Sequence, residues 1–475
     1  MILIITFFIW AISLFYKYDH LGYYDWDLAF FTQACWQLLH GSQFTSVTGI
    51  NYFGDHSYLI TFLYLPFFAL APHPLTLVFV KLIAFLMAAY LFYRIAFESL
   101  GQYPAVALMI VYIIFPANIF SILYEFNPES LAPPILFWMF SAFKKEQWRS
   151  FVWASVFLIL LKENMAMIVC AFALYGIFTR KCPPKIAWPC LLVSALFLYI
   201  SVIFIIPHFR HLSYHPFVVR YAYLGKSIGE IAFNLFTHPI RILRVILSVH
   251  NREYIQSLFG PLLVPALFSW QVLFFIFPLL LQHLLSIQAP EHSIHYHYGA
   301  TIAPFIFLAL LQTLYVCSQR FKARIFASVM ALLLAISCLD FSDHLNIYAL
   351  YLDHHHDDLS SARWAFIDAV PPQEPIIATF DFLAPLSLRK DLYAFHKVYD
   401  DSFQNPADIK LSELNTGGSF VLPGQVHYAL IDFSDPWLQS DLANNPSVRL
   451  RVDAFLKGSQ WKIIKSCESM VLLKR

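Results

Sequence analysis

The stretch YYDWDLAFFTQACWQ, residues 23–37, places two aspartates shortly after an apolar run that covers residues 2–17. A bilayer-spanning helix needs at least about 17 residues, and this run lacks the basic start and small-residue cleavage site of a signal peptide. It therefore predicts an uncleaved first span. A charged side chain costs roughly 2.5 kcal/mol or more at the centre of a bilayer. We therefore expect Asp25 and Asp27 at the membrane surface, where the first span leaves the lipid.

The composition is that of a membrane protein. Of the 475 residues, 59% are hydrophobic and 13% are charged, whereas soluble domains carry about 25% charged residues. The formal net charge of +1 argues against a nucleic-acid partner. The seven cysteines show no C-x-x-C spacing, so they indicate neither a zinc site nor a disulfide framework.

Basic clusters orient the apolar runs. Further runs cover residues 57–71, 75–97, 103–120, 130–143, 149–179, 186–206, 258–287, 299–318 and 323–340. Lysine and arginine concentrate on the cytoplasmic side of membrane proteins, which places Arg94 and the clusters at 144–149, 180–185 and 320–324 inside. With residues 18–56 outside, the runs predict about eleven crossings, an internal N-terminus and an extracytoplasmic segment after residue 341.

Three of the runs are not simple spans. Residues 149–179 have basic residues at both ends, which predicts a tight hairpin that turns at 162–164 on the outer side. Residues 258–287 predict a second short hairpin, broken near Ser269. The run 57–71 is short for a span and contains Pro66, so we expect it to lie along the membrane interface.

The segment 207–257 breaks the charge rule, because it falls outside yet is rich in arginine. Its pattern IGEIAFNLFTHPIRILRVILSV is amphipathic with a basic face. Such a helix lies flat on a membrane among lipid phosphates. We therefore expect this segment to contact anionic lipid.

The sequence after residue 341 turns polar and has the pattern of a small α/β domain. EPIIATF, DLYAFH, HYALIDF and WKIIKS are typical of strands, and ARWAFIDAV and NNPSVRLRVDAFLKG are typical of helices. The predicted fold is thus an all-α polytopic membrane domain over residues 1–341. An extracytoplasmic α/β domain over residues 342–475 follows it.

Polar side chains gather on the predicted outer face, all at helix ends and none at a membrane midpoint. Transporters place their substrate residues near the midplane, so this distribution favours chemistry at the surface. The candidate site residues are Asp25, Asp27, Asp55, His56, Glu125, Glu129, Lys162, Glu163, His295 and His297.

Each candidate also has a purely structural interpretation. Asp25 or Asp27 could cap a helix, and Lys162 with Glu163 could be an ion pair that closes the hairpin. His295 and His297 alternate with tyrosines and could be interfacial residues. The acidic and histidine-rich run at 353–358 could bind metal, but we interpret it as a solvated linker.

Several short motifs, taken in order, resemble a known family. They are DLAFFTQACW (27–36), HG (40–41), GDH (54–56), FNPE (126–129), KEN (162–164) and HYHY (295–298). Their order and spacing resemble those of a family of prokaryotic polytopic membrane proteins, the domain of unknown function 2079. That family is in turn similar to the GT-C superfamily of membrane glycosyltransferases, which use a polyprenyl-phosphate sugar and an acid in the first external loop.

The resemblance assigns roles by position. Asp27 matches the first-loop acid and Asp55 the acid of the Gly-Asp-His motif. The second-loop acids are matched by Glu125 and Glu129, the hairpin acid by Glu163 and the late histidine pair by His295 and His297. The chain departs from the family pattern at Thr32, Asn127 and Asn164, which puts a metal site in doubt.

The resemblance implies a glycosyltransferase of the cell (inner) membrane. Asp27, or alternatively Asp55, would deprotonate an acceptor hydroxyl, which then attacks the anomeric carbon of the lipid-linked sugar with inversion. The remaining candidates would bind substrate. His295, His297, Lys162, basic residues of 207–257 or a divalent cation held by the carboxylates would stabilise the leaving phosphate. A transporter or lipid flippase, or a non-catalytic sensor or scaffold, is the alternative.

Overall fold

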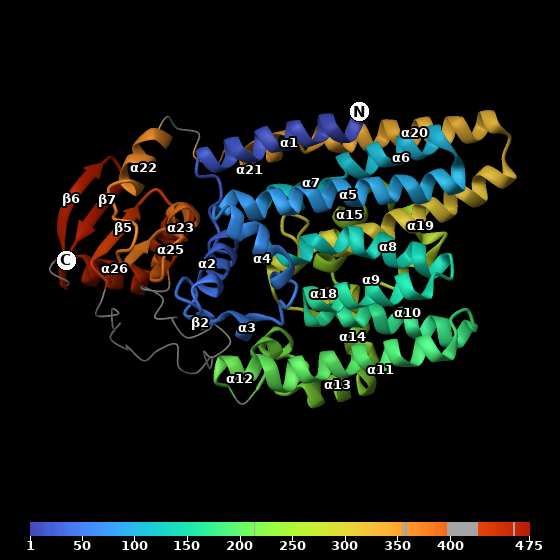
Figure 1. The fold of residues 1–475 in the computed structure, drawn as a ribbon, viewed down its shortest axis with the longest axis horizontal. Coiled ribbons are helices and arrows are strands. Elements are labelled where there is room, and N and C mark those ends of the chain that lie inside the picture. The colour runs from blue at the N-terminus through green and yellow to red at the C-terminus, as the bar shows by residue number, and fades with distance from the viewer. Residues whose placement is uncertain (213, 354, 356–358, 397–425, 459–460) are drawn as a thin grey trace.

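Helices that run side by side form one end of the molecule, and a small α/β domain forms the other (Figure 1). The computed structural model describes residues 1–212, 214–353, 355, 359–396, 426–458 and 461–475. The predicted tract at 353–358 lies mostly outside the described residues. The α/β domain sits at the end of the bundle where helix α2 (Asp27–Leu39) runs crosswise to the long helices.

Five helical segments in the described part of the chain are long and apolar enough to cross a membrane. They are α1 (Ile2–Asp19), α5 (Pro74–Leu100), the continuous segment Pro184–Arg210, α19 (Gly299–Arg320) and α20 (Ala323–Asp343). A sixth arises if α6 (Gln102–Ile114) and α7 (Pro116–Leu123), which meet at a bend of 49°, count as one span. The chain is thus a multi-pass membrane protein, and the figure of about eleven crossings stays a prediction.

Helices shorter than a full span complete the membrane domain. They are α4 (Thr61–Leu70), α8 (Ala132–Lys144), α9 (Trp148–Leu161), α10 (Ala166–Thr179), α13 (Ile228–Thr237), α14 (Pro239–Ile246), α15 (Val249–Phe259), α16 (Leu263–Leu267), α17 (Trp270–Leu273), α18 (Phe277–Leu285) and α21 (Leu345–Leu352). The chain also contains a few very short elements. They are the strands β1 (Phe44–Thr45) and β2 (Ile50–Asn51) and the helices α3 (Tyr52–Asp55) and α12 (Ile206–Arg210).

The predicted hairpin over 149–179 is present as α9 and α10, which lie side by side with a short turn at Glu163–Met165 (Figure 1). The second predicted hairpin is instead a series of three short helices, α16 to α18. Prolines at 265 and 278 and the buried Ser269, whose hydroxyl lies 2.8 Å from that of Thr313, interrupt the helix there.

The segment predicted to contact anionic lipid folds into α13, α14 and α15. On α13 and α14 no side chain is buried, and large apolar side chains such as Phe236, which is 86% exposed, stand on the surface. The amphipathic pattern is therefore confirmed, whereas the lipid contact itself stays a proposal.

The C-terminal domain is a five-stranded sheet with strand order β4-β3-β5-β7-β6. Strands β3 (Ile376–Ala378), β4 (Leu392–Ala394) and β5 (Tyr428–Asp432) are parallel, whereas β7 (Met470–Lys474) and β6 (Lys462–Cys467) run antiparallel. Its helices are α22 (Ser360–Ile367), α23 (Phe380–Leu386), α25 (Pro436–Asn444) and α26 (Pro446–Gly458). Strands β3 to β6 were predicted, and β7 was missed.

Helix α2 and the β1–β2 loop lie between the two domains. The Gln33 side chain donates to the backbone carbonyl of Arg389 (3.1 Å), and the Ser46 hydroxyl accepts from Leu392 N (2.8 Å). Ala29 of α2 packs in the same apolar cluster as the residues under the sheet. The C-terminal domain therefore rests directly on the helix that begins with Asp27, although the predicted boundary after residue 341 itself stays untested.

Candidate active site

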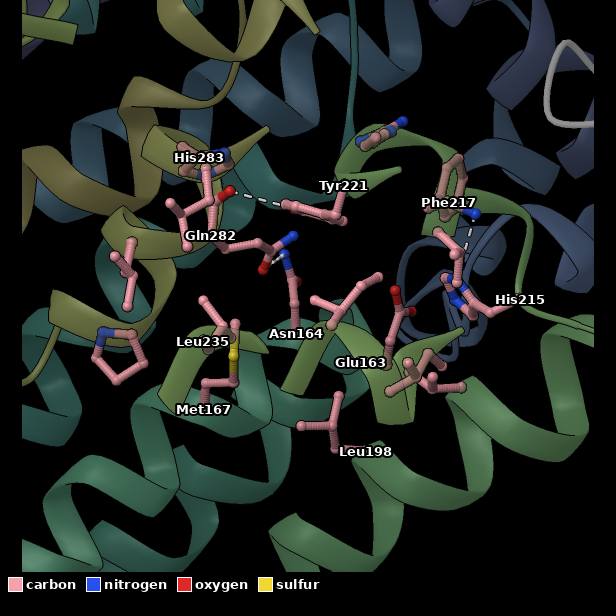
Figure 2. A pocket seen from close by; sticks show the side chains of 18 of the residues that line it. Glu163, Asn164, Met167, Leu198, His215, Phe217, Tyr221, Leu235, Gln282 and His283 are labelled. Atoms are coloured by element: carbon pink, nitrogen blue, oxygen red, sulfur yellow. Dashed lines mark hydrogen bonds between the residues drawn. The ribbon is translucent and has the colours of Figure 1, made fainter. Parts of the chain in front are cut away.

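A large cavity opens between α10, the segment Pro184–Arg210, α13 and α18. Its volume is about 910 Å³. Most of its wall is apolar, with side chains such as Met167, Leu198 and Leu235 (Figure 2). At one end the lining becomes polar, and that end includes His56, Lys162, Glu163, His215, Arg220 and Glu291. The cavity therefore has the character of a site for a long apolar molecule with a polar head.

The polar end is held by buried ion pairs. Arg220 Nη1 lies 2.7 Å from Glu291 Oε1, and His283 Nδ1 lies 2.9 Å from Glu291 Oε2. His56 Nδ1 lies 2.6 Å from Glu163 Oε1. Burial raises the pKa of Glu291, but its contacts with His283 and Arg220 lower it to about 2. Glu291 is therefore charged and keeps His283 and Arg220 oriented.

His215 presents a donor to the same cavity. Its Nδ1 accepts the backbone N–H of Phe217 (3.3 Å). Burial lowers the pKa of His215 to about 4, so the ring is neutral at pH 7 and carries its proton on Nε2. Within the described part of the chain, Nε2 is buried and has no hydrogen-bond partner. An anionic head group in the cavity could accept this hydrogen bond.

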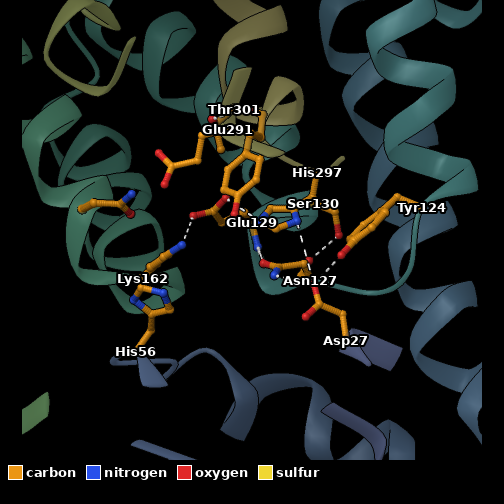
Figure 3. A network of polar contacts seen from close by, with 12 residues as sticks. Asp27, His56, Tyr124, Asn127, Glu129, Ser130, Lys162, Glu291, His297 and Thr301 are labelled. Atoms are coloured by element: carbon orange, nitrogen blue, oxygen red, sulfur yellow. Dashed lines mark hydrogen bonds and ion pairs between the residues drawn. The ribbon is translucent and has the colours of Figure 1, made fainter. Parts of the chain in front are cut away.

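A chain of polar contacts leads from the cavity to Asp27 (Figure 3). Lys162 Nζ lies 2.6 Å from Glu129 Oε1, and His297 Nε2 lies 3.4 Å from Glu129 Oε2. His297 Nδ1 faces Asp27 Oδ2 at 3.9 Å. Burial lowers the pKa of His297 to about 3, so its ring is neutral. Nε2–H can then donate to Glu129 while Nδ1 stays available as an acceptor beside Asp27.

Asp27 combines partial exposure with a crowded electrostatic environment. Its side chain is 15% exposed. Its Oδ2 accepts from Tyr124 OH (3.1 Å) and from Asn127 Nδ2 (3.4 Å). Burial, together with the negative charges of Asp25 and Glu125, raises the pKa of Asp27 well above its usual range. A carboxylate with a raised pKa is suited to accept a proton near neutral pH.

Asp55, the competing candidate, has different partners. Its Oδ1 lies 3.4 Å from Arg210 Nη2, and its Oδ2 accepts from Tyr58 OH (3.3 Å). Arg210 also donates to the backbone carbonyl of Gly54 (2.7 Å). Both carboxylate oxygens of Asp55 already have partners in Arg210 and Tyr58, so the geometry favours Asp27 as the proton acceptor.

The carboxylate of Glu125 accepts hydrogen bonds from backbone N–H groups. Its Oε1 accepts from Asp25 N (2.8 Å) and its Oε2 from Leu28 N (2.6 Å), at the start of α2. Helix starts leave backbone N–H groups without partners. Glu125 accepts one of them, Leu28 N, and also Asp25 N just before the helix. Its role in the site is therefore to fix the position of Asp27.

The two late histidines lie on different sides of the site. Whereas His297 faces Asp27 and Glu129, His295 packs against the rings of Phe120 and Tyr351. His295 lines a separate small cavity together with Asp25. His297 thus belongs to the chain of contacts that leads to Asp27, whereas His295 meets the candidates only in the small cavity that it lines with Asp25 and Glu125.

Two buried lysines that were not predicted as site residues hold the loop that carries Glu125. Lys17 Nζ donates to the carbonyl of Leu123 (2.6 Å). Lys81 Nζ donates to the carbonyls of residues 122, 124 and 125, at 2.7, 2.5 and 3.3 Å. A lone lysine within an apolar helix was the available signal, because such a residue is costly unless it serves a site.

Replacing Lys81 by methionine is expected to lower the free energy of unfolding by about 1–3 kcal/mol, because buried carbonyls lose their donor. Thermal denaturation in detergent measures this. The control is Lys145→Met, since Lys145 pairs with Glu98 on the surface at 41% side-chain exposure. This substitution should change the free energy of unfolding by less than about 1 kcal/mol. Equal effects of the two substitutions would contradict the role of Lys81.

The carboxylates do not fit a metal site in the described part of the chain. No group of three or more histidine, cysteine, aspartate or glutamate side chains there is arranged to hold a metal ion. Glu129, Glu163 and Glu291 are each paired with a cation or histidine, and Glu125 is taken up by backbone N–H groups. No step of the chemistry is therefore assigned to a divalent cation.

Comparisons with known proteins agree with this picture. A family model described as "Predicted membrane protein (DUF2079)" matches residues 17–414. The crystal structure of ArnT from Cupriavidus metallidurans bound to undecaprenyl phosphate is similar, with a TM-score of 0.54 and 11% identity over 99% of this chain and 97% of that chain. The same protein in the apo state gives a TM-score of 0.50 with the same identity and coverage. A search of curated proteins found no match.

Proposed function

This chain belongs to the DUF2079 family and has the fold of GT-C glycosyltransferases, and on that basis we propose that it transfers a sugar from a polyprenyl-phosphate donor to an acceptor hydroxyl at the extracytoplasmic membrane face. The observation that carries the proposal is the connection between the apolar cavity and Asp27. Lys162 lines the cavity and pairs with Glu129, which contacts His297, the neighbour of Asp27.

The cavity is the proposed site of the lipid donor. Its apolar wall along α10 and α13 suits a prenyl chain, and its volume of about 910 Å³ is ample for several isoprene units. Lys162, Arg220 and the Nε2–H of His215 surround the polar end, where they would bind the phosphate. The similar ArnT structure was determined with undecaprenyl phosphate bound, which supports a lipid of this class.

In the proposed reaction, Asp27 accepts the proton of the acceptor hydroxyl. The hydroxyl oxygen then forms a bond to the anomeric carbon, and the bond from that carbon to the phosphate oxygen breaks. The lipid phosphate leaves with the bonding electrons and is stabilised by Lys162, Arg220 and His215. One displacement inverts the anomeric configuration. The proton then leaves Asp27 to water, to which its side chain is 15% exposed.

The pH dependence follows from the charges around Asp27. A protonated Asp27 cannot accept a proton, so kcat/KM is expected to fall as the pH drops through its pKa. Glu125→Gln removes one of the negative charges that raise this pKa, so the acidic limb of the profile should move to lower pH. Glu163→Gln is the control and should leave the limb in place. A limb that stays fixed or moves to higher pH in Glu125→Gln would contradict the assignment.

The proposed function is tested with the purified protein in liposomes and a panel of polyprenyl-phosphate sugars. Consumption of at least one lipid-linked sugar, with release of polyprenyl phosphate, is expected by mass spectrometry. If a lipid crosses the bilayer unchanged, the protein is a flippase. If no donor is consumed or moved, the sensor or scaffold interpretation is favoured. Either result would overturn the proposal.

A further inference from the structure

We propose that a small cavity between the two domains binds the acceptor through a neutral sugar ring whose hydroxyl reacts at Asp27. This inference rests on the proposed function. The cavity has a volume of about 100 Å³ and lies beside Asp25 and Tyr124. Its aromatic lining comes from both domains, with Tyr24 and Tyr296 from the membrane domain and Trp437 from α25.

The cavity adjoins the base on the side away from the donor. Tyr124 lines the cavity, and its OH lies 3.1 Å from Asp27 Oδ2 and 3.3 Å from Asp25 Oδ2. Figure 3 shows Tyr124 and Asp27 together, with His297 and Glu129 between them and Lys162. A hydroxyl that replaces or joins the Tyr124 contact would thus reach Asp27 without crossing the cavity that we assign to the lipid.

The lining has the chemistry of a sugar site. Aromatic rings pack against the C–H faces of a sugar ring, and their hydroxyl or indole groups add polar contacts. The carboxylate of Asp25, which lines the cavity, can accept a hydrogen bond from a hydroxyl. The two acids at the wall, Asp25 and Glu125, disfavour a phosphorylated or otherwise anionic acceptor. Lys17 also lines the cavity, but its Nζ donates to the carbonyl of Leu123 (2.6 Å). Because 100 Å³ is small and Trp437 is 44% exposed, only the reacting edge of the ring enters.

The topology of the C-terminal sheet independently favours a ligand at this place. In the parallel part of the sheet, β3 lies between β4 and β5. The chain therefore goes from β3 to β4 on one side and then crosses to β5 on the other side. Ligands of open α/β sheets bind beyond the carboxyl ends of the strands at such a switch point. Asp435, just after β5, accepts from Phe380 N just after β3 (3.2 Å). Trp437 follows in the first turn of α25, so this edge of the sheet contributes directly to the cavity wall.

The test uses the full chain labelled with 5-fluorotryptophan, without any lipid donor, and follows ¹⁹F NMR signals. The Trp437 signal is assigned by its loss in Trp437→Phe. The probes are methyl glucoside, methyl mannoside, methyl galactoside and their 6-phosphates. We expect at least one neutral glycoside to shift the Trp437 signal saturably, while Trp153, which is 60% exposed on α9, does not respond.

Asp25→Asn should weaken this binding about tenfold, because it removes a charged acceptor. Lys145→Met, at the surface pair with Glu98, should leave the binding unchanged. No saturable shift with any neutral glycoside, or a stronger response to the 6-phosphates, would overturn the inference. Since the binding needs no donor, a glycoside that binds to a protein that consumes no lipid-linked sugar would refute the proposed function and leave the binding site standing.

Discussion

Replacing Asp27 by asparagine is expected to slow sugar transfer by about 10²- to 10⁴-fold, the usual contribution of a general base. Asparagine keeps the shape of the side chain and can still contact Tyr124 OH, but it cannot accept the proton of the acceptor. Stability should not fall, because the substitution removes one negative charge from a site that also holds Asp25 and Glu125. Single-turnover transfer with bound lipid-linked sugar measures the loss.

The matched control is Asp55→Asn. Asp55 is paired with Arg210, so its loss should reduce transfer by less than about tenfold if it serves only to position that arginine. A larger loss in Asp55→Asn than in Asp27→Asn would assign the base to Asp55. Full activity in both variants would show that neither residue is the base.

The buried pair of Lys162 and Glu129 should dominate stability. Their side chains are 6% and 2% exposed. Lys162→Met leaves Glu129 charged and buried without its cation, and breaking a buried pair in this way costs about 3–5 kcal/mol. Glu129 relies on Lys162 for its low pKa of about 2, so removal of the lysine also raises that pKa. Equilibrium unfolding in detergent measures the change.

The double variant Lys162→Met with Glu129→Leu separates charge from packing. Replacing a buried ion pair by apolar side chains of similar size is often neutral, so the double variant should recover most of the stability that either single variant loses. Transfer should stay low, because the phosphate loses Lys162. Additive losses of stability in the double variant would show that the pair is not energetically coupled.

The sequence was enough to predict which polar residues lie near one another. Each motif stands at the end of an apolar run, and the topology rules bring these ends of the runs to one face of the membrane. The family resemblance is confirmed by the match over residues 17–414. What each side chain contacts could not be predicted. Glu125 was expected to bind substrate, and it accepts two backbone N–H groups at the start of α2.

Contacts between distant segments account for most of the remaining differences. His295 and His297 are two residues apart, yet His295 lines the small cavity whereas His297 faces Asp27 and Glu129. No regular helix or strand sets their direction between 293 and 298. The segment 207–257 was expected to contact lipid and to offer basic residues to the phosphate, but the sequence did not single out Arg220, which lines the cavity and pairs with Glu291. Pairings across 71 residues leave no local pattern in the sequence.

The most direct measurement is a cryo-EM structure of the protein in lipid nanodiscs with undecaprenyl phosphate. We expect phosphate density at the polar end of the large cavity, in contact with Lys162, Arg220 or His215, and the prenyl chain along α10 and α13. His297 should remain beside Asp27. Lipid phosphate bound at another face of the molecule, or Asp27 and His297 far apart in the lipid-bound protein, would contradict a transfer site at this position.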